Sequence, residues 1–382
     1  MAALRILVAA NVPDNRTGGA TRIVGFVGDR LEAAGHRIEY FYDRQAAAYG
    51  VGGKLARFTF PLAVLRHARR AHLAGNPYDI VNVHEPQGAA LLALRGLAGR
   101  PIVVVTSHGS ERRAWDLGIE EGRLGRGGPS ARSRFIYPAT SLWQSALSLR
   151  LADHVFCLNE EDKAFYVSHY GRDPASITRI FPAADAPFSA AGASRDFATA
   201  RRLLFAGTWR KNKGIQDLVP AFTALLARLP DLELTVLGAG VPDEVVRAAF
   251  PETARARVTC RRTREESETV AEFAAHDLFV LPSLFEGTPL TLMEAMASAL
   301  PIVTTATCGM RDVIRDGENG LLVPIRSPAA VADAAGRLIA DRALRERLGR
   351  AARQEAMRRY TWDAVAVPVR EVYERLAAAR GR

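Results

Sequence analysis

Short apolar segments alternate with amphipathic helical segments along the chain, and this alternation constrains the fold more than any other feature. In the first half it predicts strands near Arg5–Ala9, Arg37–Tyr42, Ile80–His84, Ile102–Ser107 and His154–Leu158. A second set is predicted at Arg202–Ala206, Glu233–Leu237, Val258–Cys260, Leu278–Leu281, Ile302–Thr305 and Gly320–Val323. Helical periodicity fills the intervals, which is the pattern of parallel βαβ units. The sequence therefore predicts an α/β protein with two doubly wound, Rossmann-like domains facing a central cleft.

Composition sets the expected domain boundaries. The predicted N-terminal domain covers residues 1–185 and the C-terminal domain residues 202–360. Residues 186–201 between them are mostly small or polar and lack a strong period, so we expect a linker there. The last segment, residues 361–382, has helical spacing with Pro368 inside it, and a proline kinks a helix. From the pattern alone this helix packs on its own domain or crosses to the first.

Charge and cysteine content limit the class of protein. The chain has 382 residues, enough for two ordinary domains, and a net charge of +10. That balance fits anionic ligands, a negatively charged membrane surface or nucleic acid, and equally a general arginine bias. The three cysteines lie far apart, which fits a reducing cytosol and neither zinc nor disulfides.

Membrane and export signals are weak. The opening MAALRILVAA fits a first strand better than a signal peptide, because the apolar run is short and leads into a glycine-containing turn and a helix. No stretch reaches the roughly 18 apolar residues of a membrane span. We expect a soluble cytoplasmic protein, with peripheral attachment to the inner face of the membrane left open.

The stretch LPSLFEGTPLTLMEAMASALPIV is the most informative for function. It predicts a strand ending near Pro282, a loop containing Glu286, and a helix with Thr288 as N-cap and Pro289 as first helical residue. Glu294 then lies about a turn and a half into a helix that ends near residue 299. Open parallel sheets bind ligands at the carboxyl edge, and a helix N-terminus suits a phosphate. A nucleotide-sugar site fits this combination.

These residues resemble the E-x7-E signature of the retaining glycosyltransferases with the GT-B fold, known as family 4. The resemblance implies that Glu286 meets the donor sugar, that Glu294 holds the ribose hydroxyls, and that the final helix crosses back towards the N-terminal domain. It extends the donor site over Gly287, Thr288, Pro289 and Leu290. Surface glutamates on a helix and its preceding loop are the plain alternative.

FAGTWRKNKGIQ is a second candidate motif. Family members usually have G-R-x4-K-G, whose Arg and Lys grip the donor diphosphate. Here Lys213 and Gly214 match, but Thr208 stands where Arg is usual, and Arg210 is the candidate replacement, with Lys211 weaker. Such cations offset charge on a leaving diphosphate. A solvated basic loop is the alternative.

Three further positions follow the first-domain strands. Gly18 and Gly19 come before a helix, and the resemblance implies that they close over the donor phosphates. It also implies that His108 touches the donor sugar. His84 and Glu85, at another strand end, are candidates for the acceptor side. Ordinary turn residues or histidines bonded to local backbone are the alternatives.

Two regions carry less information. In ATCGMRDVIRDGENGLLVP only Gly309 remains where the family commonly has paired glycines, and Asp316 and Glu318 are expected to be turn residues. The insert 110–149 mixes basic, glycine and aromatic residues. It fits an acceptor pocket, a lipid contact or a flexible crossover between strands.

The predicted activity is transfer of a sugar from a nucleoside diphosphate donor to a hydroxyl acceptor with retention, in the hexosyl- or related glycosyltransferase class. His108, Lys213 and Glu286 are the candidate catalytic residues, with the leaving phosphate taking the acceptor proton. No D-x-D pair appears, so we expect no metal and no other cofactor. The base, sugar, acceptor and oligomeric state are not predicted; a glycan, a lipid-linked glycan and a metabolite all fit as acceptors.

Two other classes remain as alternatives. A nucleotide-sugar epimerase or sugar phosphorylase has similar architecture, and a basic membrane-surface or nucleic-acid binder fits the charge. A dehydrogenase is disfavoured because no G-x-G-x-x-G follows the first strand. The E-x7-E motif in a paired-domain chain favours the transferase over a pure binding protein.

Overall fold

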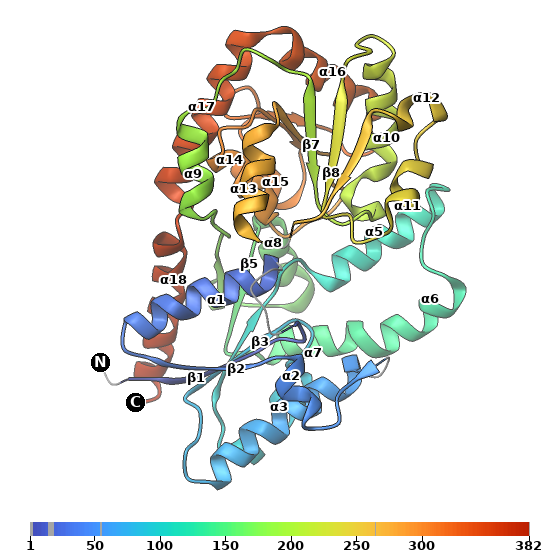
Figure 1. Cartoon of the computed structure of the whole chain (residues 1–382). Helices are drawn as coiled ribbons and strands as arrows, with labels where there is room; N and C mark the ends of the chain where they lie inside the picture. Colours follow the sequence, from blue (N-terminus) through green and yellow to red (C-terminus); the bar gives the residue numbers. More distant parts are fainter. Residues whose placement is uncertain (1–2, 14–18, 54–55, 264, 382) are drawn as a thin grey trace. The chain divides into compact units, whose positions relative to one another are not determined.

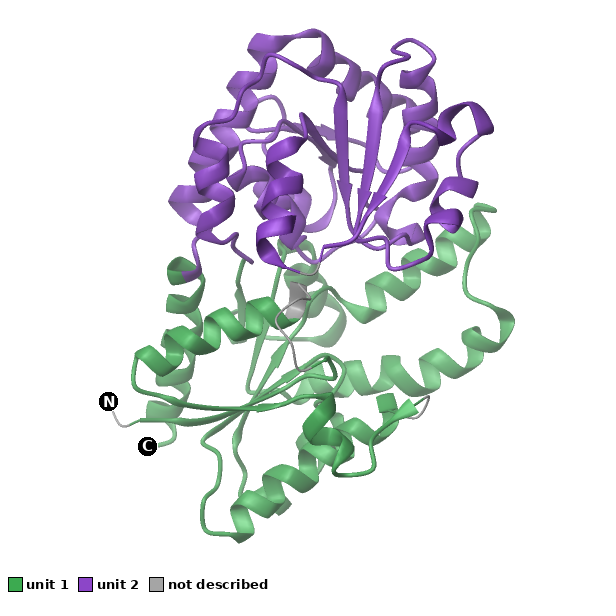
Figure 2. Ribbon diagram, in the orientation of Figure 1, with its two compact units in different colours: residues 1–181, 363–382 green, residues 182–362 purple. Residues whose placement is uncertain are grey.

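The computed structural model of the chain describes residues 3–13, 19–53, 56–263 and 265–381, and it divides into two compact units. Unit 1 comprises Met1–Phe181 with Asp363–Arg382, and unit 2 comprises Pro182–Trp362 (Figure 2). Each unit is built on its own parallel sheet (Figure 1). The expected α/β class with two doubly wound, Rossmann-like domains is therefore confirmed.

The sheet of unit 1 has the strand order β2-β1-β3-β4-β5-β6, and all its recorded pairs are parallel. Its strands are β1 Arg5–Ala9, β2 Arg37–Phe41, β3 Ile80–His84, β4 Ile102–Thr106, β5 His154–Cys157 and β6 Ile177–Arg179. Every residue of β3, β4 and β5 is buried, as expected for central strands covered on both faces. The short edge strand β6 was not predicted, because three residues show no period.

Helices cover both faces of this sheet. They are α1 Gly19–Ala33, α2 Asp43–Ala47, α3 Ala56–Leu73, α4 Ala89–Ala93, α5 Glu111–Arg123, α6 Ala131–Tyr137, α7 Trp143–Leu151, α8 Glu160–Tyr170 and α18 Trp362–Ala379, with a short 3-10 helix η2 Arg95–Ala98 and a π-helical turn η3 Pro138–Leu142. The insert 110–149 is therefore mostly helical, as α5, α6, η3 and the first part of α7.

The last helix joins unit 1. Val365, Val369 and Tyr373 of α18 are buried, and Tyr373 Oη accepts a hydrogen bond of 2.7 Å from Asn82 Nδ2 on β3. Arg30 of α1 pairs with Asp363 at 2.6 Å. Side chains of α1, α18 and the strands line a small pocket whose walls are mainly aliphatic. The chain thus leaves unit 1, builds unit 2 and returns.

The sheet of unit 2 has the order β12-β11-β10-β7-β8-β9, again with parallel pairs. Its strands are β7 Arg202–Ala206, β8 Glu233–Leu237, β9 Val258–Arg261, β10 Leu278–Leu281, β11 Ile302–Thr305 and β12 Leu321–Val323. Its helices are α9 Ala186–Ala193, α10 Ile215–Leu226, α11 Asp243–Ala248, α12 Glu252–Arg255, α13 Glu266–Ala275, α14 Leu290–Ala297, α15 Cys308–Val313, α16 Pro328–Ala340 and α17 Arg342–Arg359, with the 3-10 turn η5 Lys211–Lys213.

The expected linker 186–201 is only partly irregular. Its first half forms α9, which Asp185 precedes in extended conformation. Phe188 of α9 is fully buried, with its ring 5.4 Å from that of Phe273 on α13. The sequence pattern did not predict this helix, because its packing depends on one aromatic side chain rather than on a periodic apolar stripe.

Among the described residues, no helix combines the length and the apolar character that crossing a membrane requires. The cysteines are free thiols, with Cys157 and Cys308 buried.

Candidate functional site

The strand order indicates where a ligand is expected in the sheet of unit 2. In unit 2, β7 and β10 are neighbours although they are not consecutive, so the winding direction reverses between them. Ligands of open α/β sheets bind outside the carboxyl ends of the strands at such a switch point. Lys213 follows β7 and Glu286 follows β10. The topology therefore brings together two residues that are 73 positions apart in sequence.

Lys213 and Glu286 form an ion pair at this point. Lys213 Nζ lies 2.6 Å from Glu286 Oε1, and the two side chains are 17% and 12% exposed. Ser283 Oγ donates a second hydrogen bond to the same oxygen at 3.0 Å. A charge pair so far withdrawn from water, at a sheet edge, is positioned to exchange partners with an anionic ligand.

Backbone geometry holds the two loops together. Leu284 N donates to Asn212 O at 2.7 Å, which ties the loop after β10 to η5. Gly214 has φ of +71°, and a Cβ there would lie 1.7 Å from Pro282 O. Only glycine fits this position, so the Lys-Gly pair is required for the close approach of the loops as well as for its charge.

Glu294 lies on α14, whose side chains are almost entirely buried, and it is itself 2% exposed. The helix begins at Leu290 with Pro289 in extended conformation at the N-cap, one residue later than predicted, and it ends at Ala297 rather than near residue 299. Thr288, expected as N-cap, is instead buried in the preceding loop at 4% exposure. Leu292 N donates to Pro289 O at 3.1 Å, so Leu290 and Thr291 are the described first-turn residues whose N–H groups have no recorded intrahelical acceptor.

Gly309, which its sequence motif did not mark as a site residue, is part of the same edge. Its N–H donates to Gly287 O at 2.8 Å. A Cβ on Gly309 would lie 2.0 Å from that oxygen and 2.1 Å from Thr288 Oγ1. The available clue was an isolated glycine within a helical segment, which often has a packing reason.

The two candidates for the missing arginine lie outside this cluster. Thr208 and Arg210 are both exposed, and Arg210 precedes η5 as its N-cap. Over the described part of the chain, the Arg210 guanidinium has no recorded hydrogen bond or ion pair. The predicted contact of either residue with a diphosphate stays a prediction.

In unit 1, His84 and His108 form one pair. They end and follow the adjacent strands β3 and β4, and His108 Nε2 lies 2.7 Å from His84 Nδ1. Burial lowers the pKa of His108 to about 4 and that of His84 well below its ordinary value. In such a contact one neutral imidazole donates its N–H to the unprotonated nitrogen of the other. The tautomer of His84 therefore determines the tautomer of His108.

Glu85 is held inside unit 1. Ser145 Oγ, on α7, donates to its carboxylate, and Glu111 N donates to Oε1 at 3.3 Å. Burial raises the pKa of Glu85 to about 7, against the hydrogen bonds of Ser107 and Ser145, which lower it. The expected acceptor-side position of Glu85 stays a prediction.

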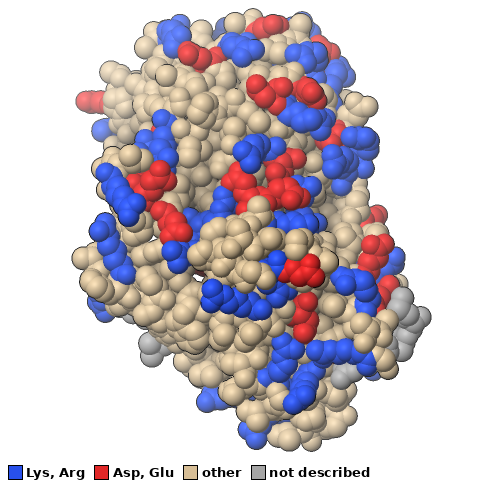
Figure 3. All heavy atoms as spheres, turned by 180° about the vertical axis from the view of Figure 1, so that it is seen from behind, with Lys and Arg blue, Asp and Glu red and all other residues tan. Residues whose placement is uncertain are grey.

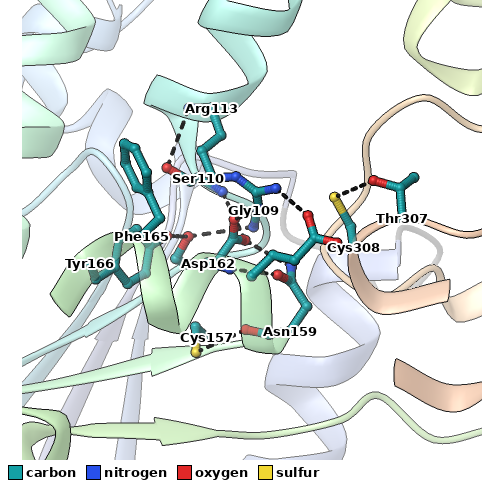
Figure 4. Close-up of polar contacts among 12 residues, drawn as sticks. Gly109, Ser110, Arg113, Cys157, Asn159, Asp162, Phe165, Tyr166, Thr307 and Cys308 are labelled. Atoms are coloured by element: carbon teal, nitrogen blue, oxygen red, sulfur yellow. Dashed lines mark hydrogen bonds and ion pairs between the residues drawn. The ribbon is translucent and has the colours of Figure 1, made fainter. Parts of the chain in front are cut away.

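The loop after His108 is fixed by a second network (Figure 4). Ser110 N donates to Asp162 Oδ2 at 3.1 Å, and Arg113 Nη1 donates to Asp162 Oδ1 at 2.6 Å. Asn159 caps α8 and also donates to Asp162 at 2.8 Å. Burial raises the pKa of Asp162, and the charge of Arg113 opposes that. These buried bonds position the loop. Figure 4 also draws Thr307 and Cys308 of unit 2, whose side chains meet at 3.5 Å.

The remaining residues named from the sequence lie before α1 and before β12. Gly18 lies outside the described residues, and Gly19 is the first residue of α1. Asp316 and Glu318 lie in the turn before β12, as predicted, and Glu318 pairs with Arg315 at 2.6 Å. No cluster of three or more metal-ligating side chains occurs in the described ranges.

Comparison with known proteins agrees with these observations. Residues 17–186 match the model of Glycosyltransferase Family 4, and residues 200–341 match that of Glycosyl transferases group 1. The chain belongs to this glycosyltransferase family. The E-x7-E segment falls inside the second match.

Relatives and solved structures fit the assignment. The chain is 33% identical to a D-inositol 3-phosphate glycosyltransferase of Corynebacterium glutamicum, over 58% of this chain and 57% of that protein. It is 28% identical to a phosphatidyl-myo-inositol mannosyltransferase of Mycobacterium leprae, over 86% of this chain and 81% of that protein. Sucrose-phosphate synthase of Thermosynechococcus elongatus has the same fold, with a TM-score of 0.76, 20% identity and coverage of 98% and 100%.

A further solved structure is that of Anabaena Alr3699/HepE in complex with UDP-glucose. It matches with a TM-score of 0.69 at 15% identity, over 97% of this chain and 99% of that chain. This likeness again concerns the fold.

Proposed function

We propose that this chain is a retaining glycosyltransferase that moves a sugar from a nucleoside diphosphate sugar to a hydroxyl acceptor. The observation that carries the proposal is the Lys213–Glu286 pair at the switch point of the second sheet. Family membership supports the reaction class. The UDP-glucose of the Anabaena protein makes a uridine nucleotide the first donor to test.

Each residue of the unit 2 cluster has one role in this proposal. Lys213 leaves Glu286 and binds the diphosphate, whose charge grows as the sugar departs. Glu286 then accepts hydrogen bonds from hydroxyls of the donor sugar, and Glu294 accepts them from the ribose diol. The first turn of α14 faces the phosphates with the N–H groups of Leu290 and Thr291.

The chemistry needs neither a metal nor another cofactor, because Lys213 and the helix N-terminus supply the positive charge. The acceptor oxygen attacks the anomeric carbon on the face from which the diphosphate leaves, so the bond to the leaving oxygen breaks as the new bond forms. The leaving phosphate takes the acceptor proton. His108, held neutral beside His84, orients the sugar hydroxyls.

The acceptor is proposed more broadly, as a hydroxyl of a glycan, a lipid-linked glycan or a metabolite. The names of the two bacterial relatives make inositol compounds the first acceptors to test. A cytoplasmic enzyme, working on lipid-linked acceptors at the membrane surface, fits the basic charge of the chain.

A thermal-shift screen of UDP- and GDP-sugars tests the donor assignment, because a ligand that binds the native state raises the melting temperature. We expect a shift for at least one sugar nucleotide, and its loss in Lys213→Ala and Glu294→Ala. Glu252→Ala, an exposed acid on α12, is the control that should keep the shift. No shift with any sugar nucleotide would contradict the proposal.

Turnover separates the transferase from the epimerase. A transferase consumes the selected donor and releases nucleoside diphosphate faster when inositol compounds or other polyols are added. Conversion of the donor to another sugar nucleotide without acceptor would favour the epimerase.

A further inference from the structure

Three segments of unit 1 lack acidic residues. Residues 44–78, 86–110 and 122–152 contain no Asp or Glu. These ranges include α3, α4, η2 and α7, which pack on the same face of the first sheet, opposite α1 and α18 (Figure 1). We call the outer sides of α3, α4, η2 and α7 the basic helical face.

On α3 this face is not simply polar. Leu62, Arg66, Arg69 and Leu73 recur at spacings of four, three and four residues, which places them along one side of the helix, and all four are exposed. The opposite side of α3 contributes buried residues to the core. Exposed leucines that stand singly are ordinary, whereas exposed leucines that gather in one place indicate an interaction site.

More exposed leucines adjoin the end of α3. Leu73, Leu94, Leu97 and Leu151 are 71%, 48%, 50% and 43% exposed. Two contacts bring their segments together. Arg95 Nη2 donates to Leu151 O at 2.8 Å, and a Cβ on Gly99 would meet the His72 ring at 2.5 Å. The end of α7 and the end of α3 therefore both border η2, and their leucines gather around it.

Among the described residues, three arginines of α3 have no recorded acidic partner, whereas Arg95 of η2 pairs with Asp153 at 3.1 Å. Within the part of the chain that the structure describes, Arg66, Arg69 and Arg70 take part in no recorded ion pair or hydrogen bond. In unit 2, by contrast, Arg315, Arg358 and Arg359 share Glu355. Figure 3 shows part of the surface of unit 1, where Lys and Arg occur with very little Asp or Glu.

Three kinds of partner fit a basic surface, and the leucines distinguish them. A second copy of this chain, docked by the same face, would oppose arginine to arginine without compensation. Nucleic acid would engage the arginines but gain little from scattered leucines. An anionic bilayer accommodates both groups, because leucines enter the acyl boundary while guanidiniums remain with the headgroup phosphates.

We propose that the basic helical face docks unit 1 on an anionic lipid bilayer. This goes beyond sugar transfer and does not depend on it. The face lies on helices that contribute none of the candidate donor-binding residues, so binding of lipid and binding of the nucleotide are separable by mutation.

The test is co-sedimentation of the full chain with vesicles of phosphatidylcholine alone or with about one third phosphatidylglycerol. We expect binding to the anionic vesicles and little to the neutral ones. Since each basic residue at such a surface contributes about 1 kcal/mol, Arg66→Gln, Arg69→Gln and Arg70→Gln combined should weaken binding by on the order of 100-fold. Leu73→Ser with Leu97→Ser should weaken it about tenfold or more.

Matched controls come from unit 2. Arg247, Arg337 and Arg342 are exposed, and changing all three to Gln removes the same charge from elsewhere. Leu229→Ser with Val245→Ser is the matched apolar control. Both controls should bind vesicles like the unaltered chain, and all variants should keep the thermal shift with UDP.

Three results would overturn the proposal. The first is an equal loss of vesicle binding in the triple arginine variant and in its unit 2 control, which would show that binding depends only on net charge. The second is equal binding to neutral and anionic vesicles. The third is a duplex DNA that displaces the vesicles while the leucine variant binds them normally.

Discussion

At the scale of single residues, the charges of Lys213 and Glu286 compensate each other, which has a consequence for the proposed donor site. A diphosphate must take Lys213 from a carboxylate that is 12% exposed, while Glu286 stays nearby to receive the sugar. A bare nucleoside diphosphate offers Glu286 nothing in return and leaves it next to an added negative charge. The pair thus favours a donor that carries its sugar over the product that has lost it.

Glu286→Gln tests this balance. Removing the carboxylate frees Lys213 and removes the repulsion, so UDP should bind about five- to tenfold more tightly, as for the loss of about 1 kcal/mol of competing pairing. Sugar transfer should fall at least 100-fold, because the donor sugar loses its acceptor group. Titration calorimetry with UDP and a turnover assay measure the two effects. Weaker UDP binding in this variant would contradict the competition.

Glu85 predicts a pH dependence of stability. Its carboxyl has a pKa of about 7 in the folded protein, above the ordinary value of 4.5, so the folded state holds this proton more tightly than the unfolded state. The stability that this proton contributes is fully present below pH 4.5 and is lost as the pH rises towards 7. Across that window the loss amounts to about 2–3 kcal/mol.

Glu85→Gln should remove that part of the dependence. Between pH 5 and pH 8, the urea midpoint of the unaltered chain should fall relative to that of the variant. Comparing the two proteins cancels the opposite trend of His84 and His108, whose lowered pKa values favour the folded state as the pH rises. Parallel curves for the two proteins would show that Glu85 titrates normally.

At the scale of elements, the close contact between the loops after β7 and β10 depends on a glycine. Gly214 allows the backbone to turn with φ of +71° directly against Pro282 O. Gly238 has φ of +73° after β8 but has open space where a Cβ would stand. The two glycines therefore share the backbone conformation and differ in the close approach.

Gly214→Ala should cost both strain and displacement, and Gly238→Ala should cost strain alone. We expect both to lose about 1 kcal/mol or slightly more from the positive φ. Only Gly214→Ala should move Lys213 from Glu286 and abolish the thermal shift with a sugar nucleotide. If both variants keep that shift, the close approach is not needed for the donor site.

At the scale of the whole chain, the path through the two units makes unit 1 depend on the last segment. Buried residues of α18 include Val365, Val369, Val372 and Tyr373, and Tyr373 is bonded to Asn82. A chain ending at residue 361 would expose the surface of unit 1 that these side chains cover. Unit 2 would lose almost none of its own residues.

We therefore expect deletion of residues 362–382 to unfold unit 1 and to leave unit 2 folded. Amide NMR spectra of the truncated chain should show dispersed signals for about half of the residues. Tyr373→Phe is the milder test and should cost about 1–3 kcal/mol, because Asn82 loses its buried partner. A fully folded truncated chain would refute the dependence.

The sequence by itself determined the class of fold and the candidate residues at the second sheet. Alternating apolar segments specify parallel strands because both faces of such sheets are covered, and eleven strands were expected in place. Local motifs also marked Glu286, Glu294 and Lys213 as candidates, because they resemble a family signature, and their roles stay predictions. Short elements without a period, such as α9 and β6, were beyond this reasoning.

Only the tertiary structure decided which of these residues meet. The pairing of Lys213 with Glu286 follows from the neighbouring positions of β7 and β10, which strand order sets and no local pattern reveals. The same holds for His84 with His108 and for Gly309 against Gly287. Contacts between distant segments depend on the packing of whole sheets, and local spacing carries no record of that packing.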